Sequence, residues 1–224
     1  MSNLLYHKDL TDAQWNRIKF LFEERKKVGR PALNPRMVFN GILWILKSGA
    51  RWRDLPSRYG NWNSVYHKFR QWCAQKVFED ILKAMVADTE KYLLVQIDST
   101  FCKVHQHATG ARKKYGNQAI GISRGGKNTK IHALVTENFQ LIGLILSGGD
   151  IRDFILSQKA QVCIPDKSHS LIKHDFNREL YKARNVVKRF FLRIKNHRHI
   201  ATRYDKLAFC FLNFVLLASA VIHF

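Results

Sequence analysis

The sequence predicts an α+β or α/β protein in which a helical N-terminal module precedes a mixed sheet with flanking helices. Up to about residue 90, apolar residues recur with the period of a helix. Beyond that point, short apolar runs alternate with turn-forming residues, as strands do. Hydrophobic residues make up 46% of the chain and aromatic residues 12%, which is enough for a buried core. We therefore expect two domains, residues 1–90 and residues 91–224.

The charge balance is strongly positive. The chain carries 38 Lys and Arg residues against 17 Asp and Glu residues, a formal net charge of +21 at pH 7. Such an excess is self-repulsive unless a polyanion offsets it. Lysine and arginine gain affinity for nucleic acids by releasing the counterions of phosphates. DNA is therefore the expected partner, and a charge that serves only solubility is the alternative.

The first 90 residues contain several helix-start signals. Thr11 is a good N-cap for a helix over residues 12–24, and Asn34 with Pro35 opens a second helix. Two more amphipathic helices are expected, and the turns between the helices carry arginines. Such an arrangement resembles a helix-turn-helix module. The expected ranges of the two further helices are 63–73 and 77–87.

The third of these helices is the best candidate for reading DNA. One face is apolar and the other is polar and basic. Arginine and glutamine can form paired hydrogen bonds with base edges, and lysine suits phosphate. An ordinary amphipathic helix with a solvated basic face is the alternative. The candidate DNA-binding residues in this helix, in the turn before it and in a later basic loop are Arg51, Arg53, His67, Lys68, Arg70, Gln71, Lys113 and Lys114.

The first expected strand covers residues 92–97 and ends at Asp98. An aspartate at the end of a strand is a common way to present a carboxylate to Mg²⁺, which prefers oxygen ligands. A structural role is the alternative for a single aspartate. A polar, basic loop follows over 103–117. Three further strands, separated by the turns RGGKN and ENFQ, are expected over 119–123, 129–136 and 141–146.

The last quarter of the chain is expected to contain two helices. The first runs from Arg178 to about Lys195 and has a basic face. The second starts at Leu207, after which no residue carries a formal charge. A buried core helix is the preferred interpretation of this segment, and a membrane span is the alternative.

The cysteines and the first residues indicate a cytoplasmic protein. Cys73, Cys102, Cys163 and Cys210 are scattered without metal-binding or redox spacing, which is typical of buried free thiols in a reducing compartment. The first ten residues show no signal-peptide pattern.

Three stretches of the sequence resemble the insertion-sequence transposases that use an Asp-Asp-Glu (DDE) triad on a ribonuclease-H-like core. They cover most of the chain and read LTDAQWNRIKFLF with GRPALNPRMVFNGILWILKSGARWRDLP and WNSVYHKFRQW, LLVQIDSTFCKVHQHATGARK with AIGISRGGKNTKIHALV, and ELYKARNVVKRFFLRIKNHRHIATRYDKLAFCFLNFVLLASA. The resemblance implies DNA transposition by metal-dependent phosphodiester strand transfer, with Mg²⁺ as the cofactor. It also implies transposon-end DNA as the partner, a homo-oligomer or an intact sister transposase, no membrane, and a bacterial, nucleoid-associated location.

The resemblance assigns roles to particular residues. Asp98 stands at the family's first catalytic aspartate and metal ligand. The family's Tyr-x2-Arg-x3-Glu-x6-Lys signature falls on Tyr181, Arg184, Lys188 and Lys195, so a lysine occupies the position of the metal-binding glutamate. The basic face of the same helix, which includes Lys188, Arg189 and Arg193, adds candidate DNA contacts.

A second departure from the family lies near residue 150. In the family, a Gly-Gly turn leads into a helix and then a strand that ends in the second aspartate. Here Gly148 and Gly149 lead almost directly into IRDFILSQKAQVCIPDK, which resembles a later part of the family. The resemblance therefore implies an internal loss and a truncated ribonuclease-H-like sheet. The strand 161–164 is expected to fill the gap, and Asp150, Asp153 and Asp166 are the remaining candidates for the missing carboxylate.

Three hypotheses of function follow. The first is a degenerate transposase, impaired because the second aspartate is missing and Lys188 replaces the glutamate. The second is a non-catalytic DNA-binding protein that occupies element ends or interferes with an intact transposase. The third is a membrane-attached basic protein that uses the apolar C-terminal segment.

Overall fold

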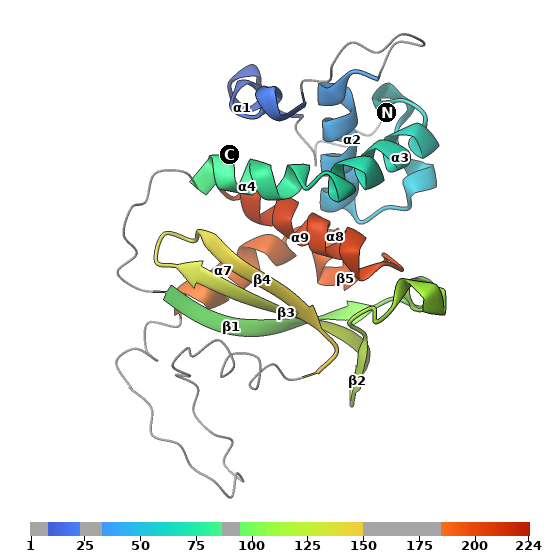
Figure 1. Cartoon of the computed structure of the whole chain (residues 1–224), viewed down its shortest axis with the longest axis vertical. Coiled ribbons are helices and arrows are strands. Elements are labelled where there is room, and N and C mark those ends of the chain that lie inside the picture. The colour runs from blue at the N-terminus through green and yellow to red at the C-terminus, as the bar shows by residue number, and fades with distance from the viewer. Residues whose placement is uncertain (1–8, 23–32, 87–94, 150–184) are drawn as a thin grey trace, which may run out of the picture.

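The computed structural model describes residues 9–22, 33–86, 95–149 and 185–224. These residues form a layer of N-terminal helices, a middle layer of C-terminal helices and a twisted sheet (Figure 1). The expected mixture of helices and strands is confirmed. Several expected features lie outside the described residues: the segments 151–159 and 161–164, and Asp150, Asp153, Asp166, Cys163, Tyr181 and Arg184.

The N-terminal layer begins with a short capped helix, α1 (Asp12–Asn16). Thr11 forms the expected cap, because its Oγ1 accepts a hydrogen bond from the Gln14 N–H at 3.3 Å and the Gln14 side chain accepts from the Thr11 N–H at 2.9 Å. The helix is shorter than the expected 12–24. It gives way to a 3₁₀ turn at Lys19–Phe22, which places Phe22 in a stack on Trp15 with ring centroids 5.1 Å apart.

The next three helices are α2 (Pro35–Ser48), α3 (Trp62–Ala74) and α4 (Val77–Val86). Asn34 caps α2 as expected. Residues 49–61 connect α2 to α3 and contain two 3₁₀ turns, so this connection is longer than the turn of about 3–4 residues in a helix-turn-helix motif. The resemblance to that motif therefore stays a prediction.

The sheet is organised around its longest strand, β3 (Gly126–Thr136). Along one edge β3 pairs in antiparallel fashion with β1 (Val95–Val104), and along the other with β2 (Gly121–Ser123) and β4 (Leu141–Ser147). The expected meander with its turns at SRGGKN and ENFQ is present. A fifth strand, β5 (Thr202–Arg203), runs parallel to β1 and pairs with its last two residues.

The expectation that the first strand ends at Asp98 is wrong. β1 continues to Val104, and Asp98 lies within it, opposite Ala133. The reason is the alternation beyond Asp98: Cys102 is buried whereas Phe101 and Lys103 are exposed. Polar residues occur on both faces of this part of the strand, which gives the sequence the appearance of a loop.

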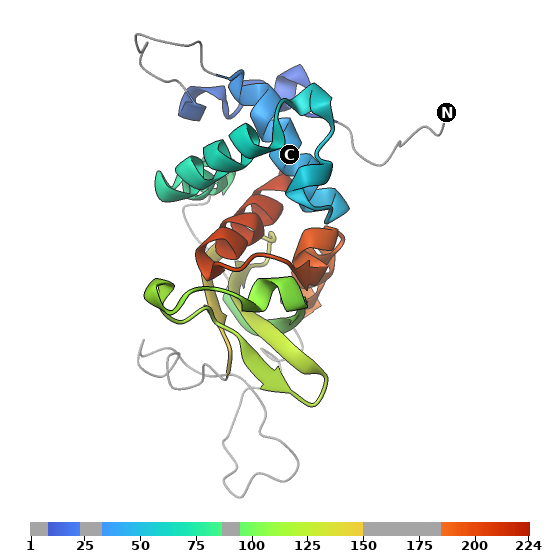
Figure 2. The same ribbon diagram turned by 90° about the vertical axis from the view of Figure 1, so that its right-hand side faces the viewer.

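The middle layer joins the sheet to the N-terminal helices. Helix α9 (Ala208–Val221) lies between α4 and the sheet (Figures 1 and 2), and Phe214 stacks on Phe69 of α3 with ring centroids 4.5 Å apart. Most of α9 is buried, which confirms the core-helix interpretation. Within the described ranges, no helix is long and apolar enough to cross a membrane.

The buried side chains of all three layers form one continuous cluster. The division into residues 1–90 and 91–224 consequently stays a prediction. Cys73, Cys102 and Cys210 are buried free thiols, as expected.

Candidate functional site

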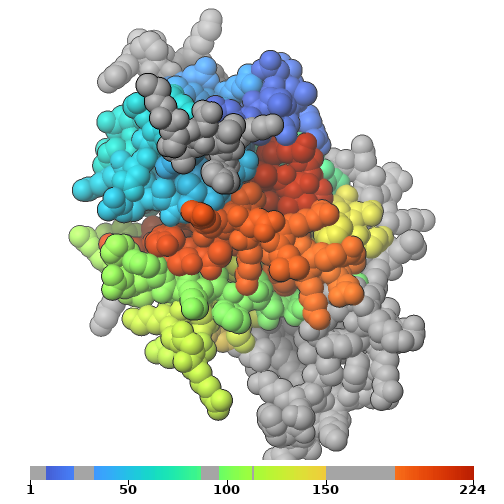
Figure 3. Space-filling view, turned by 180° about the vertical axis from the view of Figure 1, so that it is seen from behind, coloured from blue at the N-terminus to red at the C-terminus, as the bar shows by residue number. Residues whose placement is uncertain are grey.

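Helix α7 (Asn185–Lys195) carries the described part of the Tyr-Arg-Glu-Lys signature. It is packed against β1 and β3 through a buried stripe formed by Val187, Phe190, Phe191 and Ile194. From behind, residues of α7 form a band between the N-terminal helices and β1 (Figure 3). The solvent-facing side of the helix is therefore accessible, and its two flanks have different surroundings.

One flank of α7 faces β1. The Lys195 Nζ donates hydrogen bonds to Thr100 Oγ1 at 2.6 Å and to the Phe101 carbonyl oxygen at 2.8 Å. Burial lowers the pKa of Lys195 below its usual range. Lys188 precedes Lys195 by seven residues, which is about two helical turns, so both lysines belong to the same flank.

The opposite flank of α7 meets the turn between β3 and β4. The guanidinium groups of Arg189 and Arg193 lie 5.3 Å and 4.2 Å from the centroid of the Phe139 ring. Both distances fit cation–π contacts. The cations predicted to bind DNA are thus divided between two flanks: Lys188 lies on the flank toward β1, and Arg189 and Arg193 on the flank toward Phe139.

Asp98 lies on the face of β1 that the helices cover. Side chains two residues apart point to the same side of a strand, so Asp98 shares its face with Thr100. The residues opposite these two, Ala133 and Ile131, are fully or almost fully buried. Asp98 itself is half-buried, and its Oδ1 accepts a hydrogen bond from the Ser99 N–H at 2.8 Å. The structure therefore brings Asp98 and Lys195 to neighbouring positions along one face of β1.

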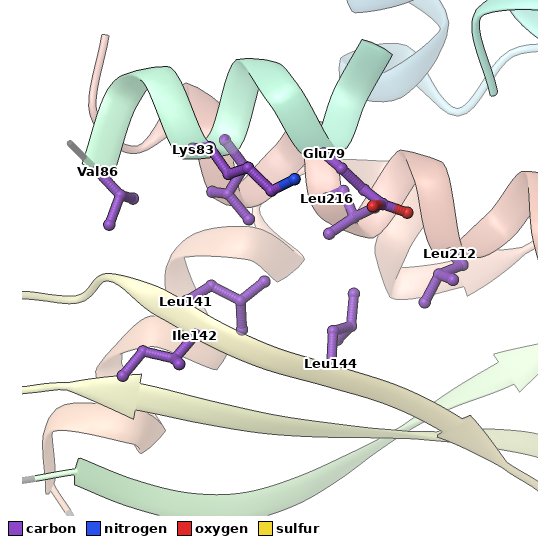
Figure 4. A pocket seen from close by; sticks show the side chains of 9 residues that line it. Glu79, Lys83, Val86, Leu141, Ile142, Leu144, Leu212 and Leu216 are labelled. Carbon is purple, nitrogen blue, oxygen red and sulfur yellow. The ribbon is translucent and has the colours of Figure 1, made fainter. Parts of the chain in front are cut away.

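Among the described parts of the chain, no group of three or more His, Cys, Asp or Glu residues is arranged to hold a metal ion. A hollow of about 360 Å³ lies elsewhere, between α4, β4 and α9 (Figure 4). It is lined mainly by leucines, with Glu79 and Lys83 at its α4 side, and contains none of the predicted site residues.

A second candidate surface is the exposed face of α3. Its buried face holds Val65, Phe69, Trp72 and Cys73. The exposed residues recur three or four positions apart, so they form one stripe along the helix. They are Asn63, Ser64, His67, Arg70, Gln71 and Ala74. Three of the residues predicted to read bases, His67, Arg70 and Gln71, are therefore together on one accessible face.

The other cations near α3 that are predicted to bind DNA form contacts with neighbouring side chains. Arg51 forms two hydrogen bonds with the Asp54 carboxylate, at 2.8 Å and 3.1 Å, which raise the pKa of the guanidinium. Arg53 lies over Trp62 at 5.6 Å. The Lys68 Nζ donates a hydrogen bond to Gln71 Oε1 at 3.3 Å, and burial lowers the pKa of Lys68. These contacts hold the cations in defined positions on the protein surface.

Lys113 and Lys114, the two predicted DNA contacts in the basic loop, lie on another element, the 3₁₀ turn Lys113–Tyr115. The Lys114 Nζ is 5.3 Å from the centroid of the Tyr115 ring. The candidate DNA contacts therefore come from four separate elements: two 3₁₀ turns, α3 and α7.

Arg203 is a structural residue that no motif of the sequence indicates. It is fully buried, and its guanidinium donates to the Gln118 carbonyl oxygen at 2.7 Å, Thr129 Oγ1 at 2.8 Å and the Asp205 carbonyl oxygen at 2.9 Å. Burial lowers its pKa. Arg203 thereby ties β5 to the segment before β2 and to β3. A buried arginine is rare, and only the three-dimensional structure reveals its carbonyl partners.

Known proteins resemble the chain most clearly in its first part. Residues 10–82 match a family model described as "Putative transposase of IS4/5 family". An insertion element IS402 uncharacterized 16.2 kDa protein of Burkholderia cepacia is 30% identical over 119 residues, which span 48% of this chain and 78% of that protein. The chain belongs to a family of transposase-related insertion-element proteins.

Another relative of this insertion-element chain is the uncharacterized protein y4sN of Sinorhizobium fredii (strain NBRC 101917 / NGR234). It is 36% identical over 121 residues, which span 52% of this chain and 96% of that protein. No solved structure matches the chain. The family model spans α1 to α4 and so includes the α3 face, whereas β1 and α7 lie beyond its matched residues.

Proposed function

We propose that this chain binds the DNA ends of an insertion element but has lost most or all of the strand-transfer activity of a DDE transposase. The observation that carries the proposal is the chemistry of the α7 flank that faces β1. Lys188 places an ammonium group on this flank at the position of the family's glutamate, beside the strand that bears Asp98, whereas Lys195 matches the signature lysine of the family.

Electrostatics explains why this flank opposes catalysis. A two-metal strand-transfer centre needs several anionic oxygen ligands to hold its cations close together. Of the described residues at the family's catalytic positions, Asp98 alone supplies a carboxylate. An ammonium in place of a ligand repels a divalent cation. Among the described residues, those at the family's catalytic positions therefore do not fit a pair of Mg²⁺ ions.

The strand arrangement supports a ribonuclease-H-like ancestry. β1, β3 and β4 form an antiparallel unit, and the second edge of β1 has a parallel neighbour in β5. This combination fits the first strands of a ribonuclease-H-like sheet with a parallel strand beside the first one. In this proposal, Asp98 is what remains of the catalytic centre.

DNA binding is supported by features that do not depend on the metal. The α3 face presents Arg70 and Gln71, which can pair with base edges. The α7 helix presents Lys188, Arg189 and Arg193 to solvent. With a formal charge of +21, we expect an affinity for DNA that falls steeply as salt rises.

A plasmid-nicking assay with the purified full chain tests the loss of catalysis. With Mg²⁺ or Mn²⁺ present, we expect no nicking above the protein-free background. Clear nicking that Asp98→Ala abolishes would refute the proposal. The same preparation should bind labelled duplex DNA, so that an inactive result cannot be attributed to misfolded protein.

The second candidate function is interference with an intact transposase, by occupying element ends or by forming mixed oligomers. It is favoured because the family model covers the α3 face, which carries residues predicted to read bases. Co-expression with an intact relative should lower the transposition frequency of a reporter element. An Arg70→Ala variant should restore the frequency where the chain acts by occupying element ends, and should still lower it where the chain acts through mixed oligomers. An unchanged frequency with the unaltered chain would exclude interference.

A further inference from the structure

The hairpin formed by β2 and the start of β3 projects from the body of the protein (Figures 2 and 3). Arg124 and Gly125 form its turn, and Gly126 takes a positive φ of 94°. Ile122 is 84% exposed, the highest value among the exposed large hydrophobic residues that the structure describes. An apolar side chain in this position is free to contact a partner.

The tip of the hairpin is purely cationic. Arg124 and Lys127 are exposed, and no acidic residue occurs between positions 121 and 128. Ile122 is directly opposite Lys127 in the strand pairing, so their side chains lie on the same face of the hairpin. This face combines one apolar side chain with positive charge, which complements a polyanion.

The base of the hairpin is fixed. The Thr129 Oγ1 donates to the Ala119 carbonyl oxygen at 2.7 Å and accepts from the Arg203 guanidinium at 2.8 Å. The backbones of Gly121 and Gly148 approach so closely that a Cβ at Gly121 would collide with the Gly148 carbonyl oxygen. A tip held in this way can bind without first becoming ordered, which lowers the entropic cost of association.

We infer that this hairpin enters the major groove of duplex DNA, with Arg124 and Lys127 on phosphates and Ile122 against a thymine methyl group. The inference rests on the proposed function, since it assumes that the chain binds DNA. A two-stranded β-ribbon fits the major groove, about 12 Å wide, and the thymine methyl group is the apolar feature exposed there. The hairpin is thus a contact separate from α3 and α7.

The apolar part of the contact is tested with two duplexes of the same 24-base-pair alternating A·T sequence, one with thymine and one with uracil. Fluorescence anisotropy should show that the full chain binds the thymine duplex about fourfold more tightly, the effect of burying about one methyl group. In Ile122→Ala this ratio should fall to about one. Phe20→Ala, which truncates another exposed hydrophobic side chain, should keep the ratio of the unaltered chain.

The ionic part is tested by salt titration. Replacing both Arg124 and Lys127 with glutamine should reduce the slope of log affinity against log salt by about 2, because each phosphate contact contributes about 1. Lys83→Gln, on exposed α4 surface, should leave the slope unchanged. Each variant should keep the melting temperature of the unaltered chain, since the substituted side chains are exposed.

The outcomes separate this inference from the proposed function. If the unaltered chain binds DNA in a salt-dependent manner but Ile122→Ala keeps the preference for thymine, or the double variant keeps the slope, the hairpin inference is overturned and the proposed function stands. If the unaltered chain does not bind DNA, both fail. If Ile122→Asp instead changes the sedimentation mass, the hairpin contacts a second copy of the chain, and the inference is likewise overturned.

Discussion

The two basic helices, α3 and α7, use their positive charge differently. Both bury an apolar stripe against the shared core and expose cationic residues. On α3, the exposed stripe with His67, Arg70 and Gln71 faces outward. On α7, Lys195 faces β1 and is hydrogen-bonded to Thr100 and Phe101, while Lys188 on the same flank is exposed to solvent.

This difference shows that the value of a positive charge depends on what lies opposite it. A cation that faces DNA gains affinity through counterion release. A cation at the position of a metal ligand repels the metal and removes the chemistry that the metal supplies. The same composition can therefore favour DNA binding and oppose catalysis in different parts of one chain.

The largest effect on DNA binding is expected from a substitution on α3. Replacing Arg70 with alanine should weaken binding to a preferred DNA sequence by about 1–3 kcal/mol and relax the specificity at one base pair, because a paired contact with a base edge is lost. Competition binding with a randomised set of duplexes measures both quantities. Lys83→Ala serves as the control, because it removes one exposed cation from α4. An equal loss of affinity for every sequence would show that Arg70 contacts phosphate instead.

An intermediate effect is expected from Lys188→Glu on α7, which restores the family's glutamate. Binding should weaken about equally for all sequences, and the salt slope should fall by about 1, since a phosphate contact is removed. Arg198→Glu, an exposed charge reversal beyond the end of α7, serves as a matched control.

Catalysis should not return in the same Lys188→Glu variant, because the resemblance places the loss of the second aspartate near residue 150. The plasmid assay with Mn²⁺ is the sensitive measurement. Nicking by this variant would mean that the glutamate alone was missing, and that another acidic residue already replaces the second aspartate.

The sequence predicted those parts of the fold that depend on local signals. The caps at Thr11 and Asn34 and the turn around Gly126 form through contacts between residues close in the chain. Helix α9 was predictable because an uncharged segment of its length must be buried. Local hydrogen bonding and hydrophobic burial therefore determine these elements.

Features that depend on distant residues could not be predicted in the same way. β1 extends beyond Asp98 because β3 supplies hydrogen-bonding partners as far as Lys103, and the sequence of residues 99–104 alone does not show this pairing. The contact of Lys195 with Thr100 joins residues 95 positions apart. The 3₁₀ turn that replaces the end of the expected first helix likewise brings Phe22 onto Trp15 and Phe39.

The smallest expected effect is the contribution of Lys195 to the pH dependence of the free energy of unfolding. It distinguishes this half-buried lysine from the exposed cations. Burial lowers the pKa of Lys195 below the value of 10.5 expected in the unfolded chain, so the folded state loses this proton first as the pH rises. The unfolded state then binds more protons, and the free energy of unfolding increases with pH up to about 10.5. Lys195→Met removes this contribution.

The stability of the unaltered chain relative to Lys195→Met should therefore rise between neutral pH and pH 10, by about 1–3 °C in melting temperature. Thermal unfolding followed by circular dichroism measures the difference. Lys83→Met, at an exposed position on α4, corrects for the general relief of charge repulsion at high pH. A relative stability that fell with rising pH would mean that the hydrogen bonds to Thr100 and Phe101 stabilise the ammonium more than burial destabilises it. In that case α7 would hold its positive charge beside Asp98 at a net gain to the fold, and the contrast with α3 would lie in catalysis alone.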